Sequence, residues 1–190
     1  MSFSAVILAG GKSSRMGRDK SFLEIDGETL LARQIRVARE SGAAEILISG
    51  RPDKDYSTFG CKILQDEFPD AGPLGGIHSA LLAAQNPLVL VLAVDLPHLT
   101  SDLLKRLVKE TQAGLGAIPH FEGKVEPLAA FYPRAALSLC ETFLQQNNRA
   151  VKNFAAGCVK NSLARFIDLP AVDEACFSNW NTPEDASLPR

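Results

Sequence analysis

The sequence feature that most constrains the fold is a six-residue run without a polar side chain, Leu88–Ala93 (Leu-Val-Leu-Val-Leu-Ala). Strands of parallel sheets read as continuous apolar runs, because helices cover both faces of such sheets. The run is far shorter than the ~20 apolar residues that a membrane-spanning helix needs. We therefore interpret it as the central strand of a parallel sheet.

Strand-like and helix-like segments alternate on both sides of this run. Further strands are predicted at Ser4–Leu8, Glu45–Ser49, Lys62–Gln65, Gly116–His120, Pro127–Tyr132 and Ala164–Leu169. Helices are predicted at Thr29–Ser41, Gly75–Gln85, Ser101–Gln112 (capped by Ser101), Arg134–Gln146 and Val151–Ala156, with a last helix starting after Asn181 and capped by Thr182. Such alternation predicts an α/β three-layer sandwich with a mainly parallel central sheet.

The length and charge of the chain indicate how many domains it forms and which partners it does not bind. A domain usually has roughly 100–200 residues, so we expect residues 1–190 to form a single domain. The chain has 20 Lys and Arg against 22 Asp and Glu, for a net charge of −2. It therefore lacks a general basic field that would hold nucleic acid, and no membrane partner is expected.

The cysteines favour a reducing compartment. Cys61, Cys140, Cys158 and Cys176 form no Cys-x-x-Cys pair, and the three histidines are scattered. This spacing disfavours a zinc site or a disulfide framework, so we expect four buried thiols. The apolar N-terminus is not preceded by a basic segment, so we expect no signal peptide and a cytoplasmic location.

The strongest chemical signal is the Gly-rich loop after the first strand, residues 8–20 (Leu-Ala-Gly-Gly-Lys-Ser-Ser-Arg-Met-Gly-Arg-Asp-Lys). Gly10 and Gly11 let the backbone approach a ligand and direct its amides at phosphate oxygens. Arg15 offers a planar fork of donors, and Lys20 offers a compact positive charge. The spacing matches neither a Walker A loop nor Gly-x-Gly-x-x-Gly. A phosphate site of another type is predicted, in preference to a solvated basic turn.

A carboxylate follows the central apolar run, at Asp95 in Val94-Asp-Leu-Pro97. Ligands of open parallel sheets bind beyond the carboxyl ends of the strands, where the Gly-rich loop also points. A carboxylate beside a polyphosphate suits Mg²⁺, which takes oxygen ligands and shares them with phosphates. An Asp before Pro can instead cap a turn, but together with the loop we favour a metal ligand.

A second carboxylate, Asp66, follows the strand at 62–65 and precedes a Gly-rich segment at 71–76. It can accept hydrogen bonds from ribose hydroxyls or from N–H groups on a base edge, and a plain surface loop is the alternative. Three other polar residues have no evident local duty: Glu126, Asn179 and Asn181. Trp180 is interpreted as a packing residue.

Together these segments resemble the molybdenum cofactor guanylyltransferase family over nearly the whole chain. The resemblance rests on the loop at 8–20, Gly72-Pro-Leu-Gly-Gly-Ile77, Asp95-x-Pro97, Glu126-Pro-Leu128 and Asn179-x-Asn-Thr-Pro-Glu-Asp185. The segment Asn148–Phe154 also looks like the Arg-containing helix start of that family. The opening motif is shared with the wider nucleotidyltransferase superfamily, and the closing motif is specific to the molybdenum branch. The resemblance implies a nucleotide-diphospho-sugar-transferase-like, Rossmann-like fold.

The resemblance also implies an activity and the residues that perform it. The activity is transfer of GMP from GTP to the phosphate of molybdopterin, which releases pyrophosphate and forms the guanine dinucleotide cofactor, with Mg²⁺ as the metal. Nucleotide binding is expected at Leu8, Ala9, Gly10, Gly11, Lys20, Asp66 and Asp95, the metal at Asp95, and catalysis at Lys20, Arg15 and Asp95. Some members have Asn where this chain has Ser49-Gly-Arg51, so that contact stays open.

A simple mechanism would suffice for this reaction. A phosphate monoester has a second pKa of about 6, so the acceptor is anionic at neutral pH and needs no general base. Lys20, Arg15, loop amides and Mg²⁺ would offset the repulsion between two anions. The alternatives are a cytidylyltransferase acting on the same cofactor, another small nucleotidyltransferase, or a nucleotide-binding module without catalysis. A partner among other molybdenum cofactor biosynthesis proteins is left open.

Overall fold

The computed structural model describes residues 1–10, 20–68 and 70–180. Within these ranges, one eight-stranded sheet has the order β10-β7-β9-β6-β1-β4-β5, and β8 pairs with β7. Its strands are β1 (Phe3–Leu8), β4 (Glu45–Ser49), β5 (Lys62–Leu64), β6 (Leu88–Ala93), β7 (Gly116–Phe121), β8 (Lys124–Val125), β9 (Ala129–Pro133) and β10 (Ala164–Asp168). A separate hairpin consists of β2 (Glu24–Ile25) and β3 (Glu28–Thr29).

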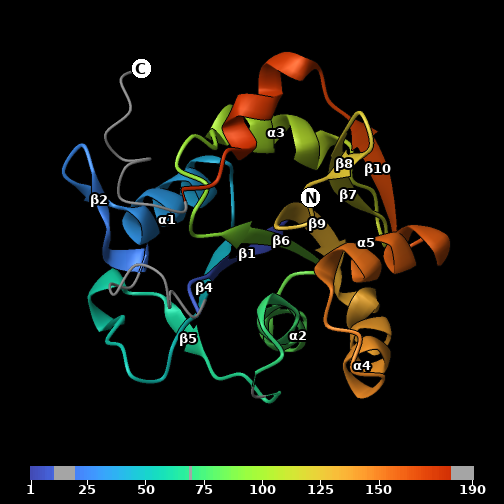
Figure 1. Ribbon diagram of the computed structural model, residues 1–190, viewed down its shortest axis with the longest axis horizontal. Coiled ribbons are helices and arrows are strands. Elements are labelled where there is room, and N and C mark those ends of the chain that lie inside the picture. Colours follow the sequence, from blue (N-terminus) through green and yellow to red (C-terminus); the bar gives the residue numbers. More distant parts are fainter. Residues whose placement is uncertain (11–19, 69, 181–190) are drawn as a thin grey trace.

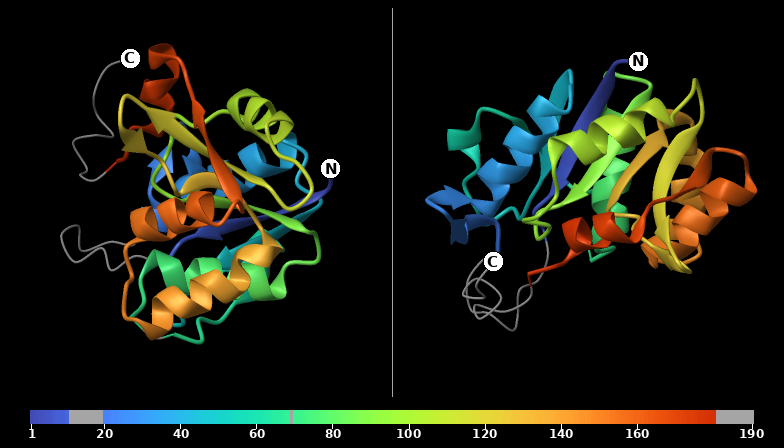
Figure 2. Two further views of the ribbon diagram at one scale, coloured as in Figure 1. Left: turned by 90° about the vertical axis from the view of Figure 1, so that its right-hand side faces the viewer. Right: turned by 90° about the horizontal axis from the view of Figure 1, so that it is seen from above.

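Helices cover both faces of the large sheet. The α-helices are α1 (Leu30–Glu40), α2 (Pro73–Ala83), α3 (Ser101–Lys109), α4 (Leu137–Gln145) and α5 (Val151–Lys160). Four 3₁₀ segments are described as well: η1 (Lys20–Phe22), η2 (Ser57–Phe59), η3 (Arg134–Ala136) and η4 (Ala171–Phe177). Figures 1 and 2 show α1 and α3 on one face and α2, α4 and α5 on the other. The predicted three-layer α/β sandwich is confirmed.

The two cores follow from the alternation of side chains along each strand. In β1, Phe3 and Ile7 pack into the core beneath α1 and α3, whereas Val6 packs beneath α2. Strand β6 contributes to both cores and is buried along its whole length. It pairs in parallel with β1 and antiparallel with β9, so the prediction of a central, doubly covered strand is confirmed.

The sheet is mixed because of β9 and the short strand β8, which is antiparallel to β7. β9 is antiparallel to both β6 and β7, whereas β1, β4, β5 and β6 are mutually parallel, as are β7 and β10. Only residues 122–128 connect β7 to β9. A parallel crossover needs a dozen or more residues, so this connection forces an antiparallel return.

Several predicted boundaries differ from the observed ones. Helix α2 starts at Pro73 instead of Gly75, because Pro fits the first turn of a helix. Helix α3 is capped by Thr100 instead of Ser101: the Thr100 hydroxyl accepts a hydrogen bond from the Leu103 N–H at 3.3 Å. Strand β9 is shifted to 129–133 from the predicted 127–132. The helix predicted after Asn181 lies outside the described residues.

The expectation of four buried thiols is right for two of them. Cys140 and Cys158 are buried, whereas Cys61 and Cys176 are partly exposed, and all four are free. Burial raises the pKa of both the Cys140 and Cys158 thiols to about 12. In the described ranges, no helix is long and apolar enough to cross a membrane.

Candidate functional site at the carboxyl edge of the sheet

Four adjacent parallel strands end in one row at the carboxyl edge of the sheet. The register pairs Ala93 of β6 with Leu8 of β1, Leu8 with Ser49 of β4, and Ser49 with Leu64 of β5. Asp95 and Asp66 each follow the row by two residues, at its two ends. Neighbouring strands lie ~4.8 Å apart, so β6 and β5 are separated by about 14 Å. The two carboxylates predicted as ligands therefore follow strands at opposite ends of this row, β6 and β5, with β1 and β4 between them. Figure 1 shows the four strands.

Lys20 and Asp95 form an ion pair at one end of this row. The Lys20 Nζ lies 3.2 Å from the Asp95 Oδ2, and the two side chains are 19% and 24% exposed. Lys20 also donates a hydrogen bond to the Trp180 carbonyl at 2.9 Å, and the Trp180 N–H donates to the Asp95 carbonyl at 3.0 Å. Three segments that are distant in sequence therefore meet here, with both charged groups accessible to a ligand.

The end of β1 is held by hydrogen bonds to both neighbouring segments. The Ala9 N–H donates to the Ser49 carbonyl at 2.8 Å, and the Val94 N–H donates to the Leu8 carbonyl at 3.3 Å. Gly10 follows and is exposed, and a Cβ there would meet only ordinary contacts, 3.8 Å from the Gly50 backbone. Leu8, Ala9 and Gly10 thus lie where the sequence predicted. The predicted residues Gly11 and Arg15 lie outside the described residues.

Asp66 stands at the other end of the row, beside two buried serines. The Ser49 and Ser79 hydroxyls donate to the Asp66 Oδ1 at 3.3 and 3.2 Å. Ser49 ends β4 and Ser79 lies on α2, and they are 3% and 5% exposed. Ser79 was not predicted as a site residue, because a serine inside a helical pattern does not indicate what it faces.

The loop after β4 is built over an aromatic ring. Tyr56 is fully buried, and its hydroxyl accepts a hydrogen bond from the Arg51 N–H at 3.1 Å. A side chain at Gly50 would collide with this ring, so the backbone passes directly over it. Phe22 stacks on the Tyr56 ring at a centroid distance of 5.8 Å. This support of the edge between Gly10 and Asp66 was also missed by the sequence analysis.

The residues to which sequence analysis assigned no clear role differ in their surroundings. Glu126 forms a local ion pair: the Lys124 Nζ lies 2.9 Å from the Glu126 Oε1, and this contact raises the pKa of Lys124. Trp180 packs edge-to-face against the exposed His98, with ring centroids 6.1 Å apart, as the packing interpretation predicted. Asn179 is exposed, and Asn181 lies outside the described residues.

The predicted Arg-containing helix start also touches the site region. Arg149, just before α5, donates a hydrogen bond to the Asp70 carbonyl at 2.7 Å. Asp70 belongs to the loop that leads from Asp66 into α2, and it adopts a positive φ of 61°. This contact ties the loop beside Asp66 to the α4–α5 side of the molecule.

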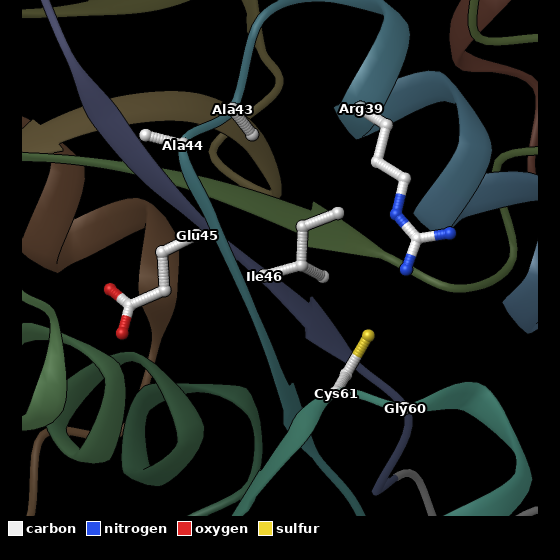
Figure 3. A pocket seen from close by; sticks show the side chains of 7 residues that line it. All are labelled: Arg39, Ala43, Ala44, Glu45, Ile46, Gly60 and Cys61. Carbon is white, nitrogen blue, oxygen red and sulfur yellow. The ribbon is translucent and has the colours of Figure 1, made fainter.

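A separate pocket lies away from this row. It has a volume of about 170 Å³ and is lined by Arg39, Ala43, Ala44, Glu45, Ile46, Gly60 and Cys61. Figure 3 shows it at the start of β4, which is the amino end of the strand. Burial raises the pKa of the Cys61 thiol, which disfavours a reactive thiolate there. The pocket is therefore not part of the candidate site.

The fold is shared with solved nucleotidyltransferases. Molybdopterin-guanine dinucleotide biosynthesis protein A from Archaeoglobus fulgidus superposes with a TM-score of 0.74 and 21% identity, over 97% of this chain and 95% of that chain. The 2-C-methyl-D-erythritol 4-phosphate cytidylyltransferase from Thermus thermophilus gives a TM-score of 0.73 and 21% identity, over 98% of this chain and 96% of that chain. The architecture is therefore that of the nucleotidyltransferase class.

Sequence comparison narrows the class to a family. Residues 5–159 match the MobA-like NTP transferase domain. A probable molybdenum cofactor guanylyltransferase from Opitutus terrae is 40% identical over 187 residues, which cover 97% of this chain and 93% of that protein. The chain belongs to the MobA-like NTP transferase family. The resemblance drawn from the sequence motifs is confirmed.

Proposed function

We propose that this protein transfers GMP from GTP to the phosphate of molybdopterin and releases pyrophosphate. The observation that carries the proposal is the accessible Lys20–Asp95 pair, which lies at the carboxyl edge of the sheet of a family member. The printed name of the relative from Opitutus terrae supports the guanylyl donor and the molybdenum cofactor acceptor.

The nucleotide would lie along the row of strand ends. Its phosphates would meet Lys20 and Asp95 beyond β6, and its base would meet Asp66 beyond β5. Leu8, Ala9 and Gly10 would lie beneath the nucleotide between these two ends, because β1 and β4 separate them. The direction in which the nucleotide lies follows from charge. The Lys20 ammonium suits the phosphates, and the Asp66 carboxylate suits the N–H groups of the base.

The donor set at Asp95 fits Mg²⁺. Asp95 offers one partly exposed carboxylate, and within the described ranges no group of three or more His, Cys, Asp and Glu side chains could hold a metal. Mg²⁺ is commonly bound by one or two carboxylates, with phosphates and water as the other ligands. A bound Mg²⁺ would neutralise phosphate charge, and Asp95 would hold it.

Lys20 would act by position and charge. Its ion pair with Asp95 is partly exposed, and such pairs contribute little net stability, so nucleotide phosphates can displace it. The freed ammonium would then stabilise the charge that develops as pyrophosphate leaves. Arg15 is proposed for the same task, and Gly11 for backbone contact with the phosphates. The anionic acceptor requires no base from the protein.

The proposal is tested by incubating the purified protein with molybdate-loaded molybdopterin, Mg²⁺ and each nucleoside triphosphate in turn. Pyrophosphate release and formation of the dinucleotide are both measured. We expect both with GTP. Product with CTP instead would identify a cytidylyltransferase, and nucleotide binding without either product would identify a binding module. One domain over residues 1–190 and a cytoplasmic location remain predictions.

A further inference from the structure

We infer that Ser49 and Ser79 are positioning residues that hold the Asp66 carboxylate for recognition of the guanine base. The inference rests on the proposed function, because it assumes that Asp66 meets the base of GTP. It adds two residues to the site and assigns them a role in choosing the nucleotide.

The geometry around Asp66 is unusual for an exposed strand-end residue. Two buried hydroxyls from different elements, Ser49 on β4 and Ser79 on α2, donate to the same oxygen, Oδ1. Ser79 shares its proton with the Gln65 carbonyl, which lies 3.3 Å away. In the described part of the chain, the hydrogen bonds made to this carboxylate end on Oδ1. An ionised carboxylate has about four acceptor sites, so Oδ2 can serve a ligand.

The packing of α2 preserves this arrangement. A Cβ on Gly76 would lie 2.5 Å from the Ser49 Oγ and 2.8 Å from the Leu8 Cδ2. Helix α2 therefore passes close enough to β4 for its Ser79 to reach Asp66 only because position 76 has no side chain. A Cβ on Gly75 would lie 3.7 Å from the Asp66 Oδ2, so the second oxygen also borders this glycine pair.

The chemistry of the base explains why orientation matters. Guanine presents an N1–H and an exocyclic 2-amino group side by side, and one carboxylate oxygen with two open acceptor sites can accept from both when it lies opposite them. Cytosine offers an acceptor nitrogen at that edge, which an ionised carboxylate cannot satisfy. Sites built on polar pairing reject a wrong partner strongly. Two hydroxyls on Oδ1 restrict rotation of the Asp66 side chain and so keep Oδ2, whose acceptor sites remain for a ligand, directed at the base.

The experiment measures the dissociation constants of GTP, ITP and CTP with Mg²⁺ by calorimetry, without an acceptor. ITP lacks the 2-amino group, so the ratio of its dissociation constant to that of GTP reports alignment at that group. The variants are Ser49→Ala, Ser79→Ala and the double variant, with Asp66→Asn as reference. Ser41→Ala is the matched control, because Ser41 is 6% exposed and its hydroxyl donates to the Ala38 carbonyl at 2.7 Å in another part of the fold.

We expect the double variant to lower the preference for GTP over ITP about five- to tenfold, the order expected when aligned hydrogen bonds are lost. Ser41→Ala should leave the ratio unchanged, and Asp66→Asn should lower it at least as much as the double variant. Ser79→Thr, which keeps the hydroxyl, should retain more of the preference than Ser79→Ala. A purely structural role would weaken GTP and ITP binding equally.

Two failures can be told apart. If the unaltered protein does not prefer GTP to CTP, the proposed function is wrong. If it prefers GTP but the double variant keeps the wild-type ratio of GTP to ITP, the positioning role is wrong and the proposed function stands. Should the double variant not fold, the two single variants decide the same question.

Discussion

At the scale of residues, the site combines two opposite charges that contact each other directly. Lys20 and Asp95 lie 3.2 Å apart, and each is about one-fifth to one-quarter exposed. Partly exposed pairs of this kind are usually worth about 0–1 kcal/mol. The fold therefore does not depend on the pair, and substitutions at either position should report on function.

We predict that Lys20→Ala lowers the turnover of GTP by on the order of 10²–10³, because one preorganised electrostatic donor is lost from the transition state. The rate of pyrophosphate release at saturating GTP measures the effect. Lys105→Ala is the matched control, since Lys105 forms an exposed ion pair with Asp102 within α3 and has no role in the candidate site. Near-normal turnover of a folded Lys20→Ala protein would remove Lys20 from the mechanism.

We predict that Asp95→Asn folds normally but loses most of its activity, with partial recovery at high Mg²⁺ or with Mn²⁺. Asn keeps the shape of Asp but lacks the charge that would hold the metal. Activity is measured as a function of metal concentration, with Asp102→Asn as the control. Asn and Asp are similar as caps. Wild-type activity with an unchanged Mg²⁺ requirement would therefore mean that Asp95 only caps a turn.

At the scale of elements, the close approach of α2 to β4 shapes the Asp66 end of the candidate site. Its glycine at position 76 faces Ser49 and Leu8, both in the row of strand ends. By contrast, Gly157 on α5 faces the end of the Phe143 ring, where a Cβ would lie 2.9 Å from the Cζ. The same substitution therefore meets a packed strand edge in one helix and a movable side chain in the other.

We predict that Gly76→Ala lowers the free energy of unfolding by roughly 1–3 kcal/mol, the usual cost of overpacking a core. It should also weaken GTP binding by displacing Ser49. Gly157→Ala should be close to neutral, because Ala gains about 1 kcal/mol of helix propensity over Gly and the Phe143 ring can move. Urea denaturation of both variants measures the difference, and equal stabilities would contradict the assigned contacts.

At the scale of the whole molecule, one sheet separates two cores, and the core under α2, α4 and α5 buries two thiols. Cys140 and Cys158 are fully buried there, in contact with the same cluster as Tyr132. Burial raises the pKa of both thiols from 9.0 to about 12, and it raises the pKa of Tyr132 as well. These groups link the stability of the folded state to alkaline pH.

We predict that stability falls as pH rises from 9.0 towards 12. In that range the unfolded chain releases thiol protons that the folded state retains, so unfolding becomes more favourable. Below 9.0 the contribution of these thiols is complete. Urea denaturation at pH 8 and pH 10 tests this, and a Cys140→Ala/Cys158→Ala variant should show a shallower loss between the two. An equal loss in both proteins would argue against the thiols as its source.

The sequence alone was sufficient for features that depend on local pattern. The continuous apolar run predicted β6 with its observed bounds, and Asp95 and Asp66 lie just after β6 and β5, as predicted, while their roles remain predictions. Strand positions can be predicted in this way because the spacing of apolar residues along the sequence indicates which side chains are buried. The motifs also pointed to the right family, since the loop at 8–20 and the closing segment at 179–185 both resemble it.

Tertiary structure decided which distant groups meet. The order of the strands, with β1 between β6 and β4, sets the separation of Asp95 from Asp66. The contacts of Lys20 with the Trp180 carbonyl and of Ser79 with Asp66 join different elements. Such contacts depend on how strands are ordered and how closely helices approach them. The periodicity of hydrophobic residues indicates which face of a helix or strand is buried. It does not indicate which other helix or strand packs on that face.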